Sequence, residues 1–159
     1  MYEIHAKAVI AAPLQRVFDA VCDHEHFFQG PSMTCRLVTP GREHRNGLGA
    51  VREVAAEGSV FTEEVTAFDP PRRIEYVIRK VVDARGKPVG IKHDGGWIDF
   101  SPVGDATQVV WRSRFKLSPP VLGWILERWI GPRAARGFAG LLQQAKAKLE
   151  TKAGQSVRV

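Results

Sequence analysis

One long amphipathic helix, predicted near the C-terminal end of the chain, most constrains the fold. Over residues 132–149 apolar side chains recur at steps of three and four; they are Ala134, Phe138, Leu141, Leu142, Ala145 and Leu149. That spacing places them on one helix face, which must lie against an apolar surface. Nearly all the sequence before residue 117 has the short alternating patterns of β-strands. A single helix after a run of strands can bury its apolar face on their sheet, so the sequence predicts an α+β fold.

The length of 159 residues favours one domain, which we expect to span residues 1–150, followed by a flexible basic tail over 151–159. A chain of this size buries about 70% of its unfolded surface, so its core needs no disulfide or metal. The two cysteines, Cys22 and Cys35, have no metal-ligand spacing. We therefore expect neither a metal nor a cofactor. The first ten residues lack the hydrophobic region of a signal peptide, so we expect a cytoplasmic protein.

Seven strands and two short helices are predicted before the long helix. The strands cover residues 4–10, 32–38, 48–56, 60–68, 72–82, 91–101 and 107–117. The two short helices, one starting at Pro13 and one over residues 23–28, connect the first strand to the second. Consecutive strands with short connections pair antiparallel, so we expect one antiparallel sheet.

Three turns between these strands predict which residues lie opposite one another. The predicted pairs are Arg52–Glu63, Val54–Phe61, Ala50–Val65, Ala67–Ile74, Val65–Tyr76, Glu63–Ile78, Phe100–Val109 and Ile98–Trp111. Directly opposed residues share a face of the sheet. The three hairpins agree on one face, which collects Ala50, Arg52, Val54, Phe61, Glu63, Val65, Ile74, Tyr76, Ile78, Ile98, Phe100, Val109, Trp111 and Phe115. We expect the long helix to cover this mostly apolar face.

The order of elements resembles the helix-grip arrangement of the SRPBCC or START-like superfamily, and within it the polyketide cyclase/dehydrase-like proteins. The resemblance is carried by IHAKAVIAAPLQRVFDAVCD, GLGAVREV, TEEVTAFDPPRRIEY and GFAGLLQQAKAKLE, and it extends over residues 3–150. It implies a strongly curved sheet around the last helix, with an apolar cavity between them. Members of the superfamily bind lipids, sterols, plant hormones, polyketides or quinones, and a minority are enzymes. The sequence lacks the Rieske and zinc ligands of some members.

A small hydrophobic or amphipathic ligand is therefore the expected partner. The candidate ligand-binding residues are Arg52, Val54, Phe61, Glu63, Tyr76, Ile78, Ile98, Trp111 and Phe138. A few placed polar groups can orient an otherwise apolar ligand, and in ligand-binding relatives the positions matching Arg52 and Glu63 lie on the cavity side. Two alternatives stay open: Arg52 and Glu63 form a structural pair at the rim of the sheet, and Tyr76 is an ordinary core residue.

Three functions remain open for such a site. In an enzyme with cyclase or dehydratase chemistry, Glu63 is the candidate catalytic base that removes a proton next to a carbonyl, and Arg52 or Tyr76 stabilises the enolate oxygen. A carrier or chaperone for a lipid or quinone needs no reaction. An interaction module would instead dock a partner or a membrane.

Residues 121–130 are the stretch through which an interaction module would dock. Seven of these ten residues are apolar, including Trp124 and Trp129, and on a helix they cover more than one buried stripe requires. The stretch Val121–Ile130 can cap the core, act as a lid, or form a peripheral membrane or homodimer contact. Directly after this stretch, Gly131-Pro132 is expected to break or kink the helix.

Other polar and charged features are given structural interpretations. The His24-Glu25-His26 stretch lacks a third ligand, so we expect surface residues on a short helix and no metal. The Gly95-Gly96 pair predicts a strand kink or space for a ligand. The net charge is +6, and residues 131–159 hold six basic residues and one acidic residue. No nucleic-acid-binding motif accompanies that charge, so we expect no nucleic-acid partner.

Overall fold

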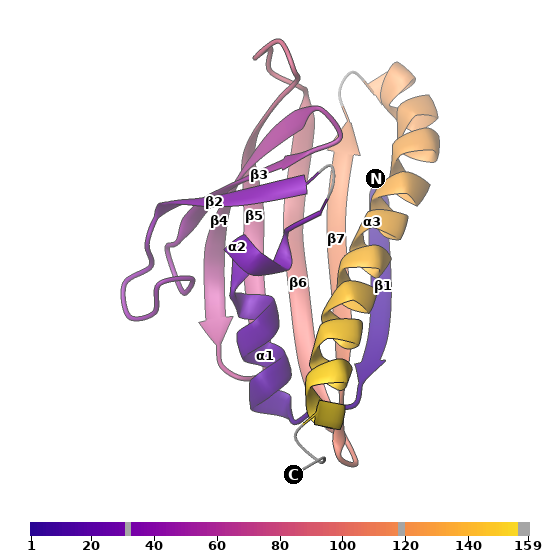
Figure 1. Cartoon of the computed structure of the whole chain (residues 1–159). Coiled ribbons are helices and arrows are strands. Elements are labelled where there is room, and N and C mark those ends of the chain that lie inside the picture. Colours follow the sequence, from indigo (N-terminus) through magenta and orange to yellow (C-terminus); the bar gives the residue numbers. More distant parts are fainter. Residues whose placement is uncertain (31–32, 118–119, 156–159) are drawn as a thin grey trace.

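The computed structural model describes residues 1–30, 33–117 and 120–155, and the side chains of 117, 120–130 and 152–155 lie outside that description. The elements are β1 (Tyr2–Ile10), α1 (Leu14–Cys22), α2 (His24–Phe27), β2 (Met33–Thr39), β3 (Val51–Ala56), β4 (Ser59–Asp69), β5 (Arg73–Val82), β6 (Ile91–Val103), β7 (Ala106–Leu117) and α3 (Pro120–Gln155). Figure 1 shows a curved sheet with all three helices on one side. The predicted α+β helix-grip fold is confirmed.

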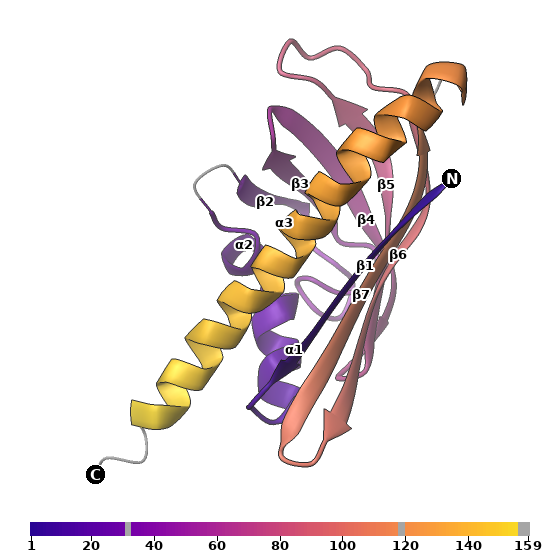
Figure 2. The same ribbon diagram turned by 90° about the vertical axis from the view of Figure 1, so that its right-hand side faces the viewer.

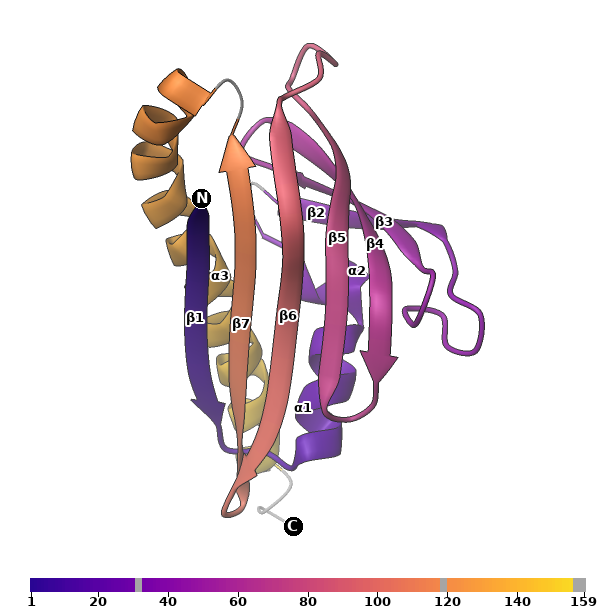
Figure 3. The same cartoon turned by 180° about the vertical axis from the view of Figure 1, so that it is seen from behind.

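The sheet contains all seven strands in the order β1-β7-β6-β5-β4-β3-β2, and every neighbouring pair is antiparallel. Only β1 pairs with a strand that is distant in the chain, from Tyr2 opposite Phe115 to Ile10 opposite Thr107. No helix among the described residues lies on the outer face of the sheet (Figure 3). The inner face is where α3 runs obliquely across β7 and β1 (Figure 2).

The predicted register holds at two hairpins and partly at the third. Arg52 lies opposite Glu63, and Ile98 lies opposite Trp111, as expected. Between β4 and β5, however, the predicted pairing of Ala67 with Ile74 is wrong, because Phe68 lies opposite Ile74. The register shifts between Val65 and Ala67, where β4 carries an extra residue. Such a bulge changes the pairing without altering the composition of the strand, so alternation alone does not reveal it.

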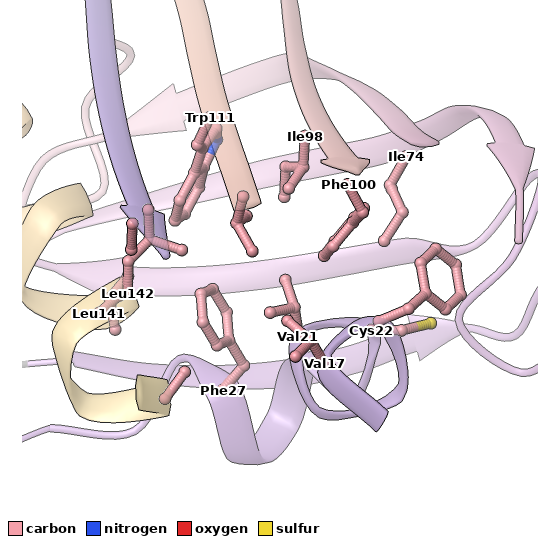
Figure 4. Close-up of a cluster of buried hydrophobic side chains, with 14 of the residues drawn as sticks. Val17, Val21, Cys22, Phe27, Ile74, Ile98, Phe100, Trp111, Leu141 and Leu142 are labelled. Atoms are coloured by element: carbon pink, nitrogen blue, oxygen red, sulfur yellow. The ribbon is translucent and has the colours of Figure 1, made fainter. Parts of the chain in front are cut away.

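The hydrophobic core is built from three directions (Figure 4). α1 and α2 contribute Val17, Val21 and Phe27, the sheet contributes Trp111, Ile98, Phe100 and Ile74, and α3 contributes Leu141 and Leu142. α3 packs along β1 and β7, whereas α1 packs against β6 and β7 and α2 against β2. The long helix therefore covers only part of the inner face, and the two short helices cover more of it.

α3 differs from the helix predicted to begin at Pro132. It is continuous from Pro120 to Gln155, with Pro132 inside it. Gly131 allows a close approach to β1, because a Cβ at that position would overlap the Tyr2 ring. The glycine thus serves packing and not helix termination. The helix passes residue 150, and the division into a 1–150 domain and a tail stays a prediction.

Residues 121–130 form early turns of α3, and their side chains lie outside the described residues. The lid, cap and partner-surface interpretations of Trp124 and Trp129 therefore stay predictions. No helix in the described part of the chain is long and apolar enough to cross a membrane.

Candidate ligand-binding site

A buried ion pair lies on the inner face of the sheet. Arg52 on β3 is 1% exposed, and Glu63 on β4 is 7% exposed. The Arg52 Nε donates a hydrogen bond of 2.8 Å to Glu63 Oε2, and the Arg52 Nη2 lies 2.7 Å from the same oxygen. The pair is therefore inside the protein and not at an exposed rim. Removing two charges from water is costly, so this pair by itself is weak evidence of a stabilising role.

Two aromatic rings flank the Arg52 guanidinium. Its central carbon lies 5.0 Å from the centroid of the Phe28 ring and 5.2 Å from that of the Tyr76 ring. Such desolvated cation–π contacts contribute about 2 kcal/mol each. Within the described part of the chain, Arg52 Nη1 and Nη2 are buried and have no hydrogen-bond partner. The rings hold the cation in place; Nη2 takes part in the ion pair with Glu63, and Nη1 remains available.

Tyr76 on β5 is held as a neutral phenol. Its hydroxyl accepts a hydrogen bond of 2.9 Å from Trp111 Nε1. Burial, followed by the nearby negative charge of Glu63, raises the pKa of Tyr76 above its usual value. Gly96 lies opposite Tyr76, and a Cβ there would overlap its ring. The glycine in β6 therefore gives the tyrosine ring the space it needs.

His93 orients the hydroxyl groups around Tyr76. The backbone N–H of Ile78 donates a hydrogen bond of 2.9 Å to His93 Nδ1, and His93 Nε2 lies 2.9 Å from Ser113 Oγ. Burial lowers the pKa of His93 to about 4, so the ring is neutral near pH 7. Because Nδ1 accepts, Nε2 carries the proton and donates it to Ser113.

Trp111 is the centre of an aromatic cluster formed by three elements. The Phe138 ring on α3 stacks on it with centroids 3.9 Å apart, and the rings of Phe27 and Phe28 lie 5.8 Å away. Trp111 is 1% exposed. The cluster adjoins the polar groups, since Trp111 itself donates to Tyr76. An apolar surface and a small set of hydrogen-bonding groups thus meet at one place.

All nine predicted ligand-binding residues lie on the inner side of the fold. Arg52, Glu63, Tyr76, Trp111 and Phe138 are brought together around the ion pair and the aromatic cluster. Val54 and Ile98 are buried in the core, and Phe61 and Ile78 pack against it. Placement therefore agrees with the prediction, while their binding role stays a proposal.

The surface position expected for His24 is wrong. His24 is 1% exposed, and both ring nitrogens lack a hydrogen-bond partner among the described residues. Burial, and then the Arg52 charge, hold the pKa of His24 well below its usual value, so it is neutral. α2 has one inward side, on which His24 and Phe27 lie three residues apart. That spacing in the sequence could have revealed the buried position of His24.

Phe28, His93 and Ser113 were also missed by sequence reasoning. Phe28 follows the end of α2, where no periodic pattern indicates its direction. His93 and Ser113 belong to neighbouring strands, β6 and β7, that are displaced by a bulge between His93 and Gly95. Their contact depends on that shift, which the sequence pattern does not show.

Thiolate and metal chemistry find little support at this site. Burial raises the pKa of Cys22 to about 12 and that of Cys35 to about 11, so both thiols are weak nucleophiles near pH 7. Among the described residues, no three His, Cys, Asp or Glu side chains gather as potential metal ligands. The groups present suit hydrogen bonding and proton transfer.

A hollow of about 390 Å³ lies between the short helices and α3. It is lined by Ala20, Asp23, His26, Phe27, Gln144, Ala145, Lys148 and Leu149. Its volume is in the range of small-molecule pockets. Phe27 lines this hollow and also contacts Trp111, so it borders both the hollow and the aromatic cluster.

Solved structures share this architecture. A protein from Thermus thermophilus is 21% identical with a TM-score of 0.72, and the match covers 95% of this chain and 99% of that one. A START superfamily protein from Mycobacterium smegmatis is 16% identical with a TM-score of 0.70, over 95% and 99% of the two chains. A protein from Chromobacterium violaceum is 20% identical with a TM-score of 0.65, over 93% and 96%. At these identities the similarity shows the fold.

No curated protein matches the sequence. A family profile, in contrast, matches residues 1–154, and its description is "Polyketide cyclase / dehydrase and lipid transport". The match spans β1 to α3, including every residue of the buried ion pair and the aromatic cluster. The chain therefore belongs to the polyketide cyclase/dehydrase and lipid transport family.

Proposed function

We propose that this protein binds a small amphipathic molecule, such as a lipid, a polyketide or a quinone, between the sheet and α3. The carrying observation is Arg52, a buried cation whose Nη1 has no hydrogen-bond partner among the described residues. Buried donors without acceptors are costly, and native proteins leave few of them. An oxygen atom of a ligand at Arg52 would remove that cost.

The apolar part of the ligand would lie against the aromatic cluster. Trp111 and Phe138 offer flat faces next to the polar groups, and Phe27 separates them from the outer hollow. This arrangement supports access of a ligand from the side of α2, a short helix of four residues.

Native mass spectrometry of the purified protein, followed by extraction of any bound molecule, tests this proposal. We expect a co-purifying amphipathic molecule, or saturable binding from a panel of fatty acids, quinones and aromatic polyketides. Narrowing the inner space by Leu142→Trp should weaken binding, whereas the exposed substitution Gln143→Trp on the same helix should not. A protein that is empty and gains no thermal stability from any panel member would contradict the proposal.

A second candidate function is proton abstraction in a cyclase or dehydratase reaction. It is favoured by the Glu63 carboxylate, which lies beside both a fixed cation and a neutral tyrosine. Glu63 would accept a proton from a carbon next to a carbonyl, and Arg52 or Tyr76 would stabilise the resulting enolate oxygen. Glu63→Gln should then abolish turnover of a bound polyketide without abolishing its binding. Equal turnover in the variant would exclude Glu63 as the base, and no turnover by the unmodified protein would favour a carrier.

A further inference from the structure

The short helices α1 and α2 lie beside the C-terminal half of α3 (Figure 1), and the hollow of about 390 Å³ opens between them. Its apolar floor is formed by Ala20 of α1, Phe27 of α2, and Ala145 and Leu149 of α3. Two of these residues are alanines, and a larger side chain at either position would take up part of the space. The volume is at the lower end of the range of roughly 300–1,000 Å³ for small-molecule sites.

One rim of the hollow carries polar groups that are not engaged within the protein. Gln144 and Lys148 are four residues apart on α3, so their side chains are neighbours on its surface. Neither side chain has a hydrogen bond or an ion pair within the described part of the chain. The nearby Lys146, in contrast, lies 2.9 Å from Glu150 Oε1 and donates a hydrogen bond of 2.6 Å to the Val9 carbonyl oxygen. Lys148 therefore offers an unpaired positive charge at the hollow, with the amide N–H groups of Gln144 beside it.

The opposite rim carries an acid that is already paired. Asp23 Oδ2 lies 2.8 Å from His26 Nδ1, in hydrogen-bond geometry. Asp23 still adds a negative charge to the lining of the hollow, so a dianionic ligand would be repelled by it. A single negative charge placed near Lys148, on the rim formed by α3, is the better electrostatic match.

The charge of the whole chain also favours an anion. The formal net charge is +6, and residues 131–159 contain six basic residues and one acidic residue. Such an excess raises the local concentration of anions and speeds their association. Because the hollow combines an apolar floor with an unpaired cation at its rim, its complement is a molecule with an apolar body and one anionic end.

We propose that this hollow is a second binding site, which holds a small monocarboxylate with an aromatic or short aliphatic body. The body lies on the apolar floor, and the carboxylate accepts hydrogen bonds from the Lys148 ammonium and the Gln144 amide. Phe27 is 6% exposed, and its ring centroid lies 5.8 Å from that of Trp111, so it stands between this site and the aromatic cluster. The second site is thus distinct from the inner site of the proposed function and does not depend on it.

The test uses three probes with one naphthalene scaffold: 2-naphthoate, the uncharged 2-naphthamide, and 2-naphthyl phosphate, which carries nearly two negative charges. Isothermal titration calorimetry gives their affinities, and chemical-shift changes in ¹H–¹⁵N spectra of the labelled protein locate them. We expect 2-naphthoate to shift the amide signals of Asp23, Phe27 and residues 144–149. It should bind about threefold to tenfold more tightly than the amide, as a charge-assisted hydrogen bond at an open site would give. At about 1 M salt that preference should disappear, because an exposed charge is screened.

Two substitutions separate the apolar floor from the cation. Ala20→Leu fills the hollow from α1 and should weaken the binding of every probe by about tenfold, whereas Ala147→Leu, at an exposed position of α3, should not. Lys148→Met should remove only the preference for 2-naphthoate over the amide. Its control is Lys7→Met at an exposed position of β1, which should leave the preference intact. Circular dichroism melts check that each variant is folded.

Each other outcome counts against a specific part of the proposal. Signal changes confined to the inner face, for example at Arg52 and Trp111, would overturn the hollow as a site while supporting the proposed function. Equal affinities for 2-naphthoate and the amide would overturn the recognition of an anion, and tightest binding of 2-naphthyl phosphate would overturn the single charge. If no probe binds, or if Ala20→Leu binds as the unmodified protein does, the second site fails. The inner site is then still judged by its own mass spectrometry experiment.

Discussion

Breaking the Arg52–Glu63 pair from one side should be far more damaging than removing it completely. Arg52→Met leaves the Glu63 carboxylate buried without its cation, and Glu63→Gln leaves the Arg52 cation buried without its carboxylate. Each single substitution is expected to lower the free energy of unfolding by about 3–5 kcal/mol. The double variant leaves no charge, so its loss should be much smaller, and replacing such pairs can even stabilise a protein.

The size of the effect follows from the surroundings of the pair. Arg52 is 1% exposed and touches the Phe28 and Tyr76 rings, so water cannot replace the lost carboxylate. In a domain of this size, a loss of 1 kcal/mol lowers the melting temperature by roughly 2–4 °C. Each single variant should therefore melt about 6–20 °C below the unmodified protein. The coupling energy in the double-mutant cycle should exceed about 3 kcal/mol.

Urea-induced unfolding followed by far-ultraviolet circular dichroism measures these four free energies. Repeating it at low salt and at about 1 M salt checks the burial, because a buried pair is screened much less than an exposed one. Arg36→Met provides the control, since the exposed Arg36–Glu53 pair should contribute about 0–1 kcal/mol. If both single variants of the buried pair behave like this control, the pair is solvated and the reasoning fails.

Three further predictions concern packing and pH. Gly96→Ala should destabilise the protein by about 1–3 kcal/mol, because its Cβ would overlap the Tyr76 ring, whereas Gly140→Ala on open helix surface should be neutral or stabilising in the same melt. Gly131→Ala should be similarly damaging through the Tyr2 ring, and combining it with Tyr2→Ala should recover part of the loss; no recovery would contradict that contact. Stability should fall as the pH drops from about 6.5 to about 4, because the unfolded His93 takes up a proton in that window whereas the folded one stays neutral. The folded pKa of His24 is also depressed, so it adds loss of the same sign, and a pH series of melting temperatures for His93→Gln should show a flatter dependence than the unmodified protein.

Much of the sheet could be predicted because its pattern is local. Turn residues at Glu57-Gly58 and Gly104-Asp105 set two registers, and both are confirmed. A two-residue period then assigns every side chain near the turn to one face. The opposition of Arg52 and Glu63 followed directly, as did their place on the inner face. The bulge near Thr66 made the third predicted register wrong beyond Val65, since an extra residue shifts the register without a distinctive composition.

The helices were harder to predict for a related reason. A proline usually ends a helix, yet α3 continues through Pro132. The glycine before it, Gly131, leaves space for the Tyr2 ring of the distant strand β1. The four residues of α2 offer only one pair at a spacing of three, His24 and Phe27, which is a weak signal of its buried side. His24 was therefore placed at the surface, although it lies within the core.

The amino-acid sequence by itself determined the order of the elements, most of the strand pairing and the inner position of the Arg52–Glu63 pair. These features depend on alternation and turn chemistry within a few residues. Only the tertiary structure decided which donors lack acceptors, because that depends on groups from α2, β3, β5, β6 and β7 meeting in one place. The hydrogen bond from Trp111 to Tyr76, for example, joins β7 to β5, and the contact between His93 and Ser113 joins β6 to β7. Hydrogen bonds of this kind require specific distances and angles, and a one-dimensional pattern does not contain them.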